Sequence, residues 1–189
     1  SPIIIILMIY IKMVSPGPIF FKQKRVGYRG RHFTLYKFRT MKHQNNEDIH
    51  KAHAATFIRE NKSMNKLDMA GDSRIIKGGR FIRVACLDEI PQLINVFLGE
   101  MSIVGPRPCI PYEESEYDHW QRQRFNILPG LTGLWQVSGK NKLSFHQMIR
   151  LDIQYANNFS FWLDLKIIFL TVPAIISMII DALMAKIRR

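Results

Sequence analysis

The chain has 189 residues, enough for one domain with a modest core, and 27 Lys and Arg against 15 Asp and Glu give a formal net charge of +12. Such a surplus points to an anionic partner, which can be a nucleic acid, an acidic lipid or a phosphorylated substrate. The two cysteines, Cys86 and Cys109, have neither CxxC nor zinc-ligand spacing, which argues against a zinc-finger protein and fits a reducing compartment.

The first 14 residues form an apolar segment. They read SPIIIILMIYIKMV, and their one charged side chain is that of Lys12. The uncharged run is shorter than the roughly 20 residues that a membrane-spanning helix needs. It is compatible with a buried helix or strand, an interfacial helix, or the second limb of a re-entrant membrane helix whose first limb precedes Ser1. Because Lys12 can extend to lipid head groups and basic sequence follows, membrane contact is favoured.

A β-hairpin is predicted after the SPGP turn at residues 15–18. Residues 19–21 and 32–38 have the aromatic and β-branched content of strands, and the glycines within residues 27–30 indicate a turn between them. The stretch 22–42 is dense in lysine and arginine. Basic residues interleaved with aromatic ones can bind nucleic acid, but their position beside the apolar segment favours anionic lipid.

Two adjacent carboxylates, Asp88 and Glu89, begin a predicted helix over residues 88–98. Apolar residues recur at helical spacing along it, and Pro91 is tolerated only in a first turn. Because a helix N-terminus favours negative charge, we expect both carboxylates to be ionised. A charged carboxylate beside a second one can act as a nucleophile or a metal ligand. The alternative is simple helix stabilisation, for which acidic residues are common in first turns.

Arginines flank this pair in the sequence. Arg80 and Arg83 are three residues apart and can lie on a short helix that leads to Asp88. Arg107 stands between the two prolines of the GPRP motif at residues 105–108, which restrict its backbone beforehand. A guanidinium fixed in this way suits bidentate phosphate binding. A rigid loop whose arginine pairs with a surface acid is an equal alternative.

Two helices are predicted in the second half of the chain. Residues 111–126 are acidic and then basic, with interspersed aromatic residues that favour a helix. A second helix is expected over residues 144–157, with Ser144 as its N-cap and Asp152 within it.

The remaining segments are a glycine-punctuated loop and an apolar C-terminal part. Glycines in residues 129–141 would let backbone amides approach a ligand, with Lys140 adding a charge, although such loops are more often plain turns. Residues 161–185 suit interfacial or core helices, since their uncharged run of about 14 residues is too short to span a bilayer comfortably.

Several stretches, in order and over nearly the whole chain, resemble one family, the bacterial sugar transferases, which are monotopic polyprenyl-phosphate phosphoglycosyl transferases. The stretches are SP at 1–2, SPGPIFFKQKRVG at 15–27, YKFRTM at 36–41, LDEIPQLINVFLGEMSIVGPRP at 87–108, LPGLTGLWQVSGKN at 128–141 and LDIQYANNFSFWLDLKIIF at 151–169. The resemblance implies an α+β fold of mostly amphipathic helices with a small β-hairpin, monotopic in a membrane. Residues 1–14 would be the second limb of a truncated re-entrant helix, and residues 15–189 a cytoplasmic catalytic domain on the membrane surface.

The resemblance also implies an activity. The family moves a sugar-1-phosphate from a UDP-sugar to undecaprenyl phosphate at the cytoplasmic face of the bacterial inner membrane, and releases UMP. This would be the first membrane step of exopolysaccharide, capsule or O-antigen assembly. The implied partners are the two substrates and inner-membrane lipids, with Mg²⁺ as cofactor; a homo-oligomer is allowed, and no nucleic acid is expected.

Roles for individual residues follow from the same resemblance. Asp88 would be the nucleophile that forms a phosphosugar intermediate, Glu89 would assist it, and both would hold Mg²⁺. Phosphate groups would be bound by Lys37, Arg83, Arg107 and Lys140, with Asp152 and Gln136 in support.

Two positions depart from the family pattern. Lys140 replaces a common arginine and loses its forked geometry, and Cys86 replaces a small hydroxyl residue, which weakens any capping role. Two other functions fit the residues: a non-catalytic basic module that binds membrane or nucleic acid through residues 22–42, and a Mg²⁺-dependent hydrolase of lipid-linked or nucleotide pyrophosphates. No residue can be assigned to the sugar ring.

Overall fold

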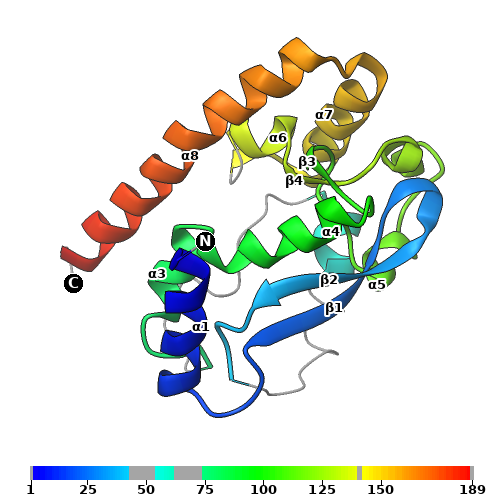
Figure 1. The fold of residues 1–189 in the computed structure, drawn as a ribbon. Helices are drawn as coiled ribbons and strands as arrows, with labels where there is room; N and C mark the ends of the chain where they lie inside the picture. The colour runs from blue at the N-terminus through cyan, green and yellow to red at the C-terminus, as the bar shows by residue number, and fades with distance from the viewer. Residues whose placement is uncertain (1, 43–53, 62–73, 140–141, 188–189) are drawn as a thin grey trace.

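The computed structural model describes residues 2–42, 54–61, 74–139 and 142–187. Helices pack with two small two-stranded sheets, so the predicted α+β class is confirmed (Figure 1). In chain order the elements are α1 (Pro2–Val14), β1 (Phe20–Val26), η1 (Tyr28–Gly30), β2 (His32–Phe38), α3 (Gly79–Val84), η3 (Leu87–Gln92), α4 (Leu93–Phe97), β3 (Ser102–Val104), α5 (Pro111–Glu114), η4 (Gln121–Asn126), β4 (Gly130–Thr132), α6 (Leu134–Val137), α7 (Phe145–Asn158) and α8 (Phe161–Ile187).

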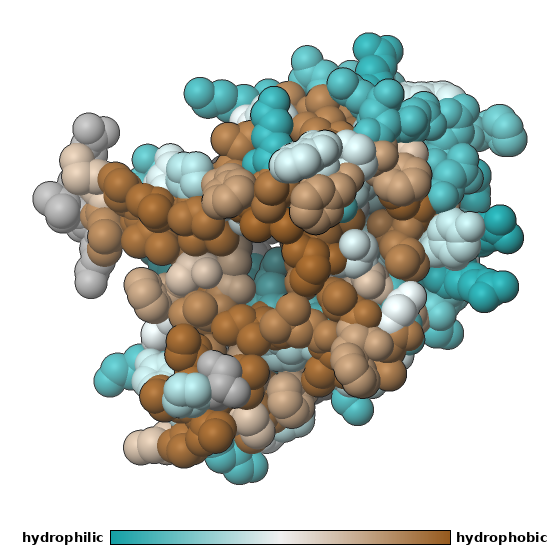
Figure 2. Space-filling model, turned by 45° about the horizontal axis from the view of Figure 1, so that its top comes forward, coloured by the Kyte–Doolittle hydropathy of each residue, from teal (hydrophilic) through white to brown (hydrophobic). Residues whose placement is uncertain are grey.

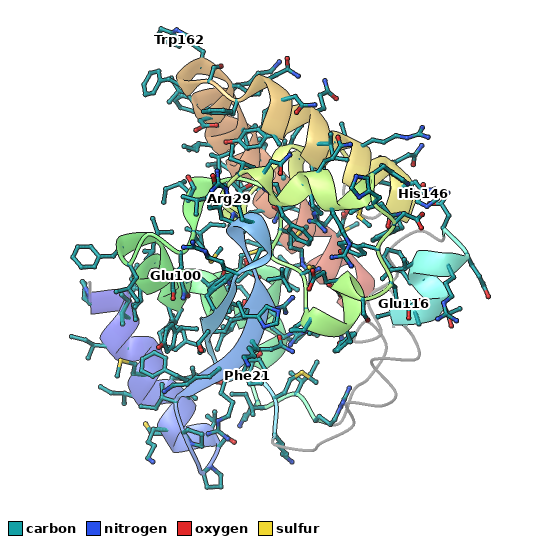
Figure 3. The ribbon with its side chains drawn as sticks, turned by 90° about the vertical axis from the view of Figure 1, so that its right-hand side faces the viewer. Phe21, Arg29, Glu100, Glu116, His146 and Trp162 are labelled. Atoms are coloured by element: carbon teal, nitrogen blue, oxygen red, sulfur yellow. The ribbon has the colours of Figure 1, made fainter. Side chains whose placement is uncertain are left out.

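Strands β1 and β2 form the predicted antiparallel hairpin. Their pairing runs from Phe20 opposite Phe38 at the open end to Val26 opposite His32 beside the η1 turn. In Figure 3, Arg29 marks the tip of the hairpin and Phe21 lies toward its base. Because strand side chains alternate between faces, Phe33, Leu35 and Lys37 share one face of β2. The first two pack against Met101, so Lys37 is carried along a strand whose position is fixed by a core.

The N-terminal apolar segment forms helix α1, which excludes the alternative of a buried strand. Ile11 is fully buried and packs with Phe38 of the hairpin and with Ile76, and Ile90 of η3 lies against the same cluster. The opposite side of α1 is exposed and apolar. The helix therefore packs one face beneath the segment that carries Asp88, and offers isoleucines outward on the other: Ile3, Ile5, Ile6 and Ile9.

The predicted helix over residues 88–98 is two shorter helices. The first, η3, is a 3-10 helix that contains Pro91, and α4 follows it directly. Cys86 precedes η3 in the left-handed region, with φ +55°, and its side chain makes no capping hydrogen bond. Pro91 has no amide hydrogen, so it donates neither an α-helical nor a 3-10 bond, and the 3-10 helix gives way to α4 two residues after it. The predicted helix over residues 111–126 is wrong in extent.

The helix predicted over residues 111–126 is interrupted between α5 and η4. The side chain of Gln121 accepts a hydrogen bond from the Asp118 amide at 2.8 Å, which ends one helical segment and begins the next. A local side-chain bond of this kind competes with helix continuation.

Strands β3 and β4 pair in parallel and bring two loops together. Ser102 lies opposite Gly130, and Val104 lies opposite Thr132. The GPRP loop begins after β3 and residues 133–139 follow β4, so both loops start from neighbouring strand ends. The Gly105 amide donates to the Thr132 carbonyl, and the Gly130 amide donates to the Pro106 carbonyl, each at 2.9 Å.

Helix α7 confirms the prediction for residues 144–157. Ser144 is its N-cap, and with Gln147 it forms a reciprocal capping box. Interfacial or core helices with a run too short to span a bilayer comfortably were expected at the C-terminus. Residues 161–187 instead form one continuous helix, which continues through Pro173. Among the described residues, α8 is the one helix long and apolar enough to cross a membrane by length and composition, and it is mostly exposed.

Apolar side chains gather on one side of the molecule. Figure 2 shows them along the projecting α8 and around a hollow whose floor is hydrophilic. Exposed large apolar residues occur on α1, α4 and α8, among them Phe97 of α4, which is 92% exposed. A patch of this extent marks an interaction surface rather than ordinary monomer surface.

Candidate active site

The two carboxylates on η3 face strand β2, and Lys37 reaches across to them. Its Nζ atom lies 2.6 Å from Oε1 of Glu89, and both side chains are partly exposed. This charge-assisted hydrogen bond orients Glu89 and places a positive charge beside Asp88. The hairpin thus brings together groups that are 52 residues apart in the sequence.

Asp88 is nearly buried, at 8% exposure. Burial raises its pKa from 3.8 to about 6, while Lys37 and Arg83 lower the pKa and Glu89 raises it. Desolvation thus outweighs the field of this short 3-10 helix, which by itself would favour the ionised form. With a pKa near 6, the group is still mostly a carboxylate at neutral pH, but one with little hydration to lose on attack.

Arg83 is supplied by α3, the predicted short helix that leads to Asp88. Its charge lowers the pKa of Asp88, and its Nη1 atom lies 3.5 Å from Thr40 Oγ1. Arg80, three residues earlier, is exposed. The turn before α3 is held by Tyr10 of α1, whose hydroxyl donates to the Lys77 carbonyl at 2.9 Å. The N-terminal helix and the Arg83 helix are therefore directly connected.

Arg107 belongs to a second group, built around the GPRP loop. Arg25 donates to the Pro108 carbonyl at 2.9 Å, and Arg124 donates to the Arg107 carbonyl at 2.7 Å. Burial and then the nearby Arg107 charge lower the pKa of Arg25 to about 10. Two buried side chains, in addition to two prolines, thus fix the backbone from which Arg107 extends.

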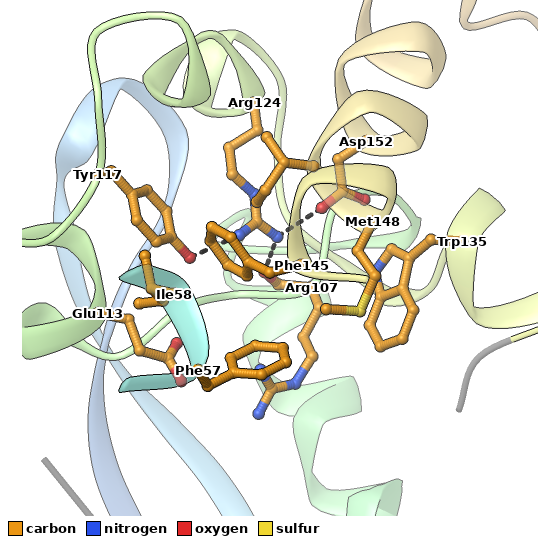
Figure 4. Close-up of a pocket in the computed structure, with 11 residues that line it drawn as sticks. Phe57, Ile58, Arg107, Glu113, Tyr117, Arg124, Trp135, Phe145, Met148 and Asp152 are labelled. Carbon is orange, nitrogen blue, oxygen red and sulfur yellow. Dashed lines mark hydrogen bonds and ion pairs between the residues drawn. The ribbon is translucent and has the colours of Figure 1, made fainter. Parts of the chain in front are cut away.

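Asp152 is buried at the base of this second group. Its Oδ2 atom accepts from Arg124 Nη2 at 2.6 Å, and Arg124 Nη1 donates to the Tyr117 hydroxyl at 2.8 Å. Burial lowers the pKa of Arg124, but the Asp152 carboxylate raises it further, so the guanidinium stays charged. In Figure 4, Arg107 extends past Phe57 and away from this ion pair. Asp152 therefore supports the site through Arg124.

The remaining predicted positions are the supporting Gln136, the phosphate-binding Lys140 and the glycines of residues 129–141. Gln136 lies on α6 with its Oε1 atom buried and without a hydrogen-bond partner among the described residues. Lys140 lies outside the described residues. The expectation that loop glycines face a ligand is corrected at Gly130 and Gly133, since a Cβ on either would collide with the backbone of Gly105. These glycines permit close contact between two loops.

Sequence reasoning missed the structural arginines. Arg39 is buried, and its guanidinium donates to the carbonyls of Ser15, Pro16 and Pro18 and to the Ser15 hydroxyl. Arg25 is buried too, so neither belongs to the solvated basic face expected for residues 22–42. No local pattern distinguishes such residues from surface cations, because their partners are main-chain carbonyls.

The carboxylate pair fits a magnesium site that is completed by the substrate. Within the described ranges, no cluster of three or more His, Cys, Asp or Glu side chains forms a closed metal site. Mg²⁺ is commonly held by one or two carboxylates together with substrate phosphates and water, which a neighbouring Asp and Glu can provide. The donor set therefore suits an ion that arrives with a phosphorylated substrate.

A buried carboxylate, a second carboxylate beside it and cations around both define a class of site suited to phosphoryl transfer. Comparison with known proteins gives the family. The sequence profile of the bacterial sugar transferases matches residues 1–178, and the chain belongs to this family of transferases.

Named relatives extend this comparison. The chain is 40% identical over 161 residues to the galactosyl transferase CpsE of Streptococcus agalactiae, covering 85% of this chain and 35% of that protein. It is 37% identical over 182 residues to the exopolysaccharide production protein ExoY of Rhizobium meliloti, covering 93% and 77%. It is 37% identical over 176 residues to the undecaprenyl-phosphate galactose phosphotransferase of Salmonella typhimurium, covering 93% and 37%. The chain thus spans about a third of two of these relatives and most of the other.

Proposed function

We propose that this protein transfers a sugar-1-phosphate from a UDP-sugar to undecaprenyl phosphate in two steps. In the first, a carboxylate oxygen of Asp88 attacks the phosphorus that bears the sugar. The bond from that phosphorus to the bridging oxygen breaks, and UMP leaves with the bond electrons. In the second, an oxygen of the lipid phosphate attacks the aspartyl phosphosugar, which releases Asp88 and forms the lipid-linked product.

The observation that carries this proposal is the setting of Asp88. The carboxylate is poorly hydrated, and Lys37 and Arg83 both act on its charge. Phosphoryl transfer depends mainly on positioning and on positive charge near the phosphate oxygens, and this arrangement supplies both. The names of the Salmonella relative and of the UDP-glucose:undecaprenyl-phosphate glucose-1-phosphate transferase of Xanthomonas campestris support the substrate class.

Mg²⁺ is part of the proposal. Asp88 and Glu89 would hold the ion against the diphosphate, where it would supply charge neutralisation for the leaving UMP. Lys37 keeps Glu89 oriented for this purpose through its 2.6 Å contact. Arg107 would bind a phosphate group from its fixed backbone.

We also propose that the protein works at the cytoplasmic face of the bacterial inner membrane, with residues 1–14 as a limb of a re-entrant helix. The support is the exposed apolar surface of α1, α4 and α8 around a hydrophilic hollow (Figure 2). Such a surface would hold the site at the depth of a lipid phosphate.

The test is a UMP-release assay with a panel of UDP-sugars, with and without undecaprenyl phosphate and Mg²⁺. UMP should appear in burst amounts without the lipid and continuously with it, together with lipid-linked sugar phosphate. Asp88→Asn should abolish both UMP and any trapped phosphosugar adduct. Continuous UMP and free sugar phosphate without lipid would indicate a hydrolase, and turnover by Asp88→Asn would reject the nucleophile.

A further inference from the structure

A buried amide joins the two elements that carry the proposed catalytic side chains. Asn95 of α4 has no exposed surface, and its side-chain amide makes three hydrogen bonds. Its Oδ1 atom accepts from the Tyr36 amide at 3.2 Å, and its Nδ2 atom donates to the Thr34 carbonyl and to Glu100 Oε2, both at 2.7 Å. Figure 3 shows Glu100 beside α4, next to the hairpin.

These bonds imitate a strand pairing. Thr34 and Tyr36 flank Leu35 on β2, and their carbonyl and amide point to the edge of the hairpin that β1 leaves open. A residue of a third, parallel strand would accept from one and donate to the other in this way. The carboxamide of Asn95 supplies the same acceptor and donor from a side chain, and so attaches α4 to one position along β2.

Both segments that Asn95 joins carry side chains of the proposed site. Lys37 is the next residue of β2 after Tyr36, and Glu89 lies on η3, which leads directly into α4. Apolar contacts among Phe33, Leu35, Met101 and Val96 lie beside this attachment. Apolar packing is non-directional, whereas a pair of hydrogen bonds fixes register along a strand, where one residue is about 3.3 Å.

We propose that Asn95 is a positioning residue, which sets the register between β2 and the η3–α4 segment so that Lys37 meets Glu89 beside Asp88. The proposal rests on the function proposed above for that site. Asn95 touches no substrate in it. Its effect reaches the reaction through the 2.6 Å contact between Lys37 and Glu89.

The first test separates positioning from general stability. Asn95→Ala should lower kcat for UMP release about 10- to 100-fold, as expected for a loss of about 1 Å of alignment, with KM for the UDP-sugar within about threefold. The matched control is Ile149→Val, a buried change in the separate core beneath α7, which should keep kcat at a temperature where both variants are folded. Normal kcat per folded Asn95→Ala molecule would overturn the proposal.

The second test exchanges hydrogen-bond donors and acceptors. Asn95→Asp keeps the acceptor for the Tyr36 amide, but it loses the donor to the Thr34 carbonyl and turns a carboxylate toward that of Glu100. Its activity should therefore fall at least as far as that of Asn95→Ala. Adding Glu100→Gln removes the repulsion between the two carboxylates but does not restore the bond to the Thr34 carbonyl, so kcat should recover only in part. Glu100→Gln alone should stay near the wild type, because its amide oxygen can still accept. A kcat of Asn95→Asp equal to that of the wild type, per folded molecule, would overturn the proposal.

A third measurement needs no activity. A double-mutant cycle of Lys37→Met and Glu89→Gln, read from urea unfolding midpoints, should show coupling in the wild type and none in the Asn95→Ala background. Equal coupling in both backgrounds would overturn the proposal. If the wild type releases no UMP but this coupling depends on Asn95, the proposed reaction fails while the positioning role stands.

Discussion

Arg124 joins the Arg107 carbonyl to the Asp152 carboxylate through a single nitrogen, Nη2, which lies 2.7 Å from one and 2.6 Å from the other. The loop that aims one proposed phosphate ligand is thus held by a buried ion pair on α7. This contact explains the supporting role of Asp152. Without its carboxylate, the buried charge of Arg124 would lose its ion-pair partner, and the GPRP loop would lose its attachment.

The first prediction concerns this ion pair. Asp152→Asn keeps the shape of the side chain but removes the charge that balances Arg124, and breaking a buried pair in this way costs about 3 to 5 kcal/mol. Urea unfolding of the variant should show that loss. The control is Glu116→Gln, whose partner Arg59 is 70% exposed, so the loss of this solvent-screened ion pair should cost far less stability. Similar losses for the two variants would show that burial does not distinguish the pairs.

The second prediction concerns Asp88 and pH. Because the folded protein binds this proton more tightly than the unfolded chain, stability falls as pH rises from about 4 to about 6, and the cost persists above that. The difference between 3.8 and about 6 corresponds to about 3 kcal/mol. Asp88→Asn should therefore be more stable than the wild type at pH 8, and little different at pH 4, in thermal melts with a chelator present.

Its control is Asp118→Asn, a change at an exposed carboxylate on the turn before η4. That variant should follow the wild type at both pH values. A stability gain for Asp88→Asn that is equal at pH 4 and pH 8 would contradict the assigned cost of ionisation.

The sequence predicted those elements whose signals are local. The hairpin and α7 were correct because strand alternation, turn glycines and the Ser144 cap act within a few residues. The pairing of Asp88 and Glu89 with Lys37 and Arg83 followed from family resemblance, and the structure brings these four together. By contrast, the helix at 88–98 was correct in extent but not in type, since residues 87–92 form a 3-10 helix after a left-handed Cys86.

Most features that the sequence analysis did not predict depend on tertiary contacts. Arg25 and Arg39 looked like surface cations, yet they bind carbonyls as far as 83 residues away in sequence, where no periodicity can reveal them. The length of α8 was underestimated because charge-free runs were counted, whereas Asp164 and Asp181 are accommodated near its two ends. Burial of Asp88, and hence its raised pKa, depends on the same long-range packing.

The third prediction assigns Arg39 to the structure rather than to the substrate. Its guanidinium fills the turn after α1 with bonds to three carbonyls, which a lysine cannot reproduce. Arg39→Lys should therefore destabilise the protein by about 2 to 3 kcal/mol, at about 1 kcal/mol for each lost hydrogen bond. KM for the UDP-sugar should not change, whereas Arg107→Lys should raise it at near-normal stability. An Arg39→Lys variant with normal stability and raised KM would place Arg39 with the substrate-binding residues instead.

The fourth prediction concerns the contact between α1 and the Arg83 helix. Gly78 has φ +71°, and a Cβ there would collide with the Tyr10 hydroxyl. Gly78→Ala should cost about 1 to 2 kcal/mol for the left-handed backbone and more for the displaced tyrosine. Gly30→Ala is the matched control, because Gly30 has φ +74° and a Cβ added to it would meet nothing within 4 Å, so it should show the backbone cost alone. Adding Tyr10→Ala should relieve part of the Gly78→Ala defect and none of the Gly30→Ala defect in melting experiments. Strict additivity in both pairs would mean that α1 and the Arg83 helix are not coupled through this turn.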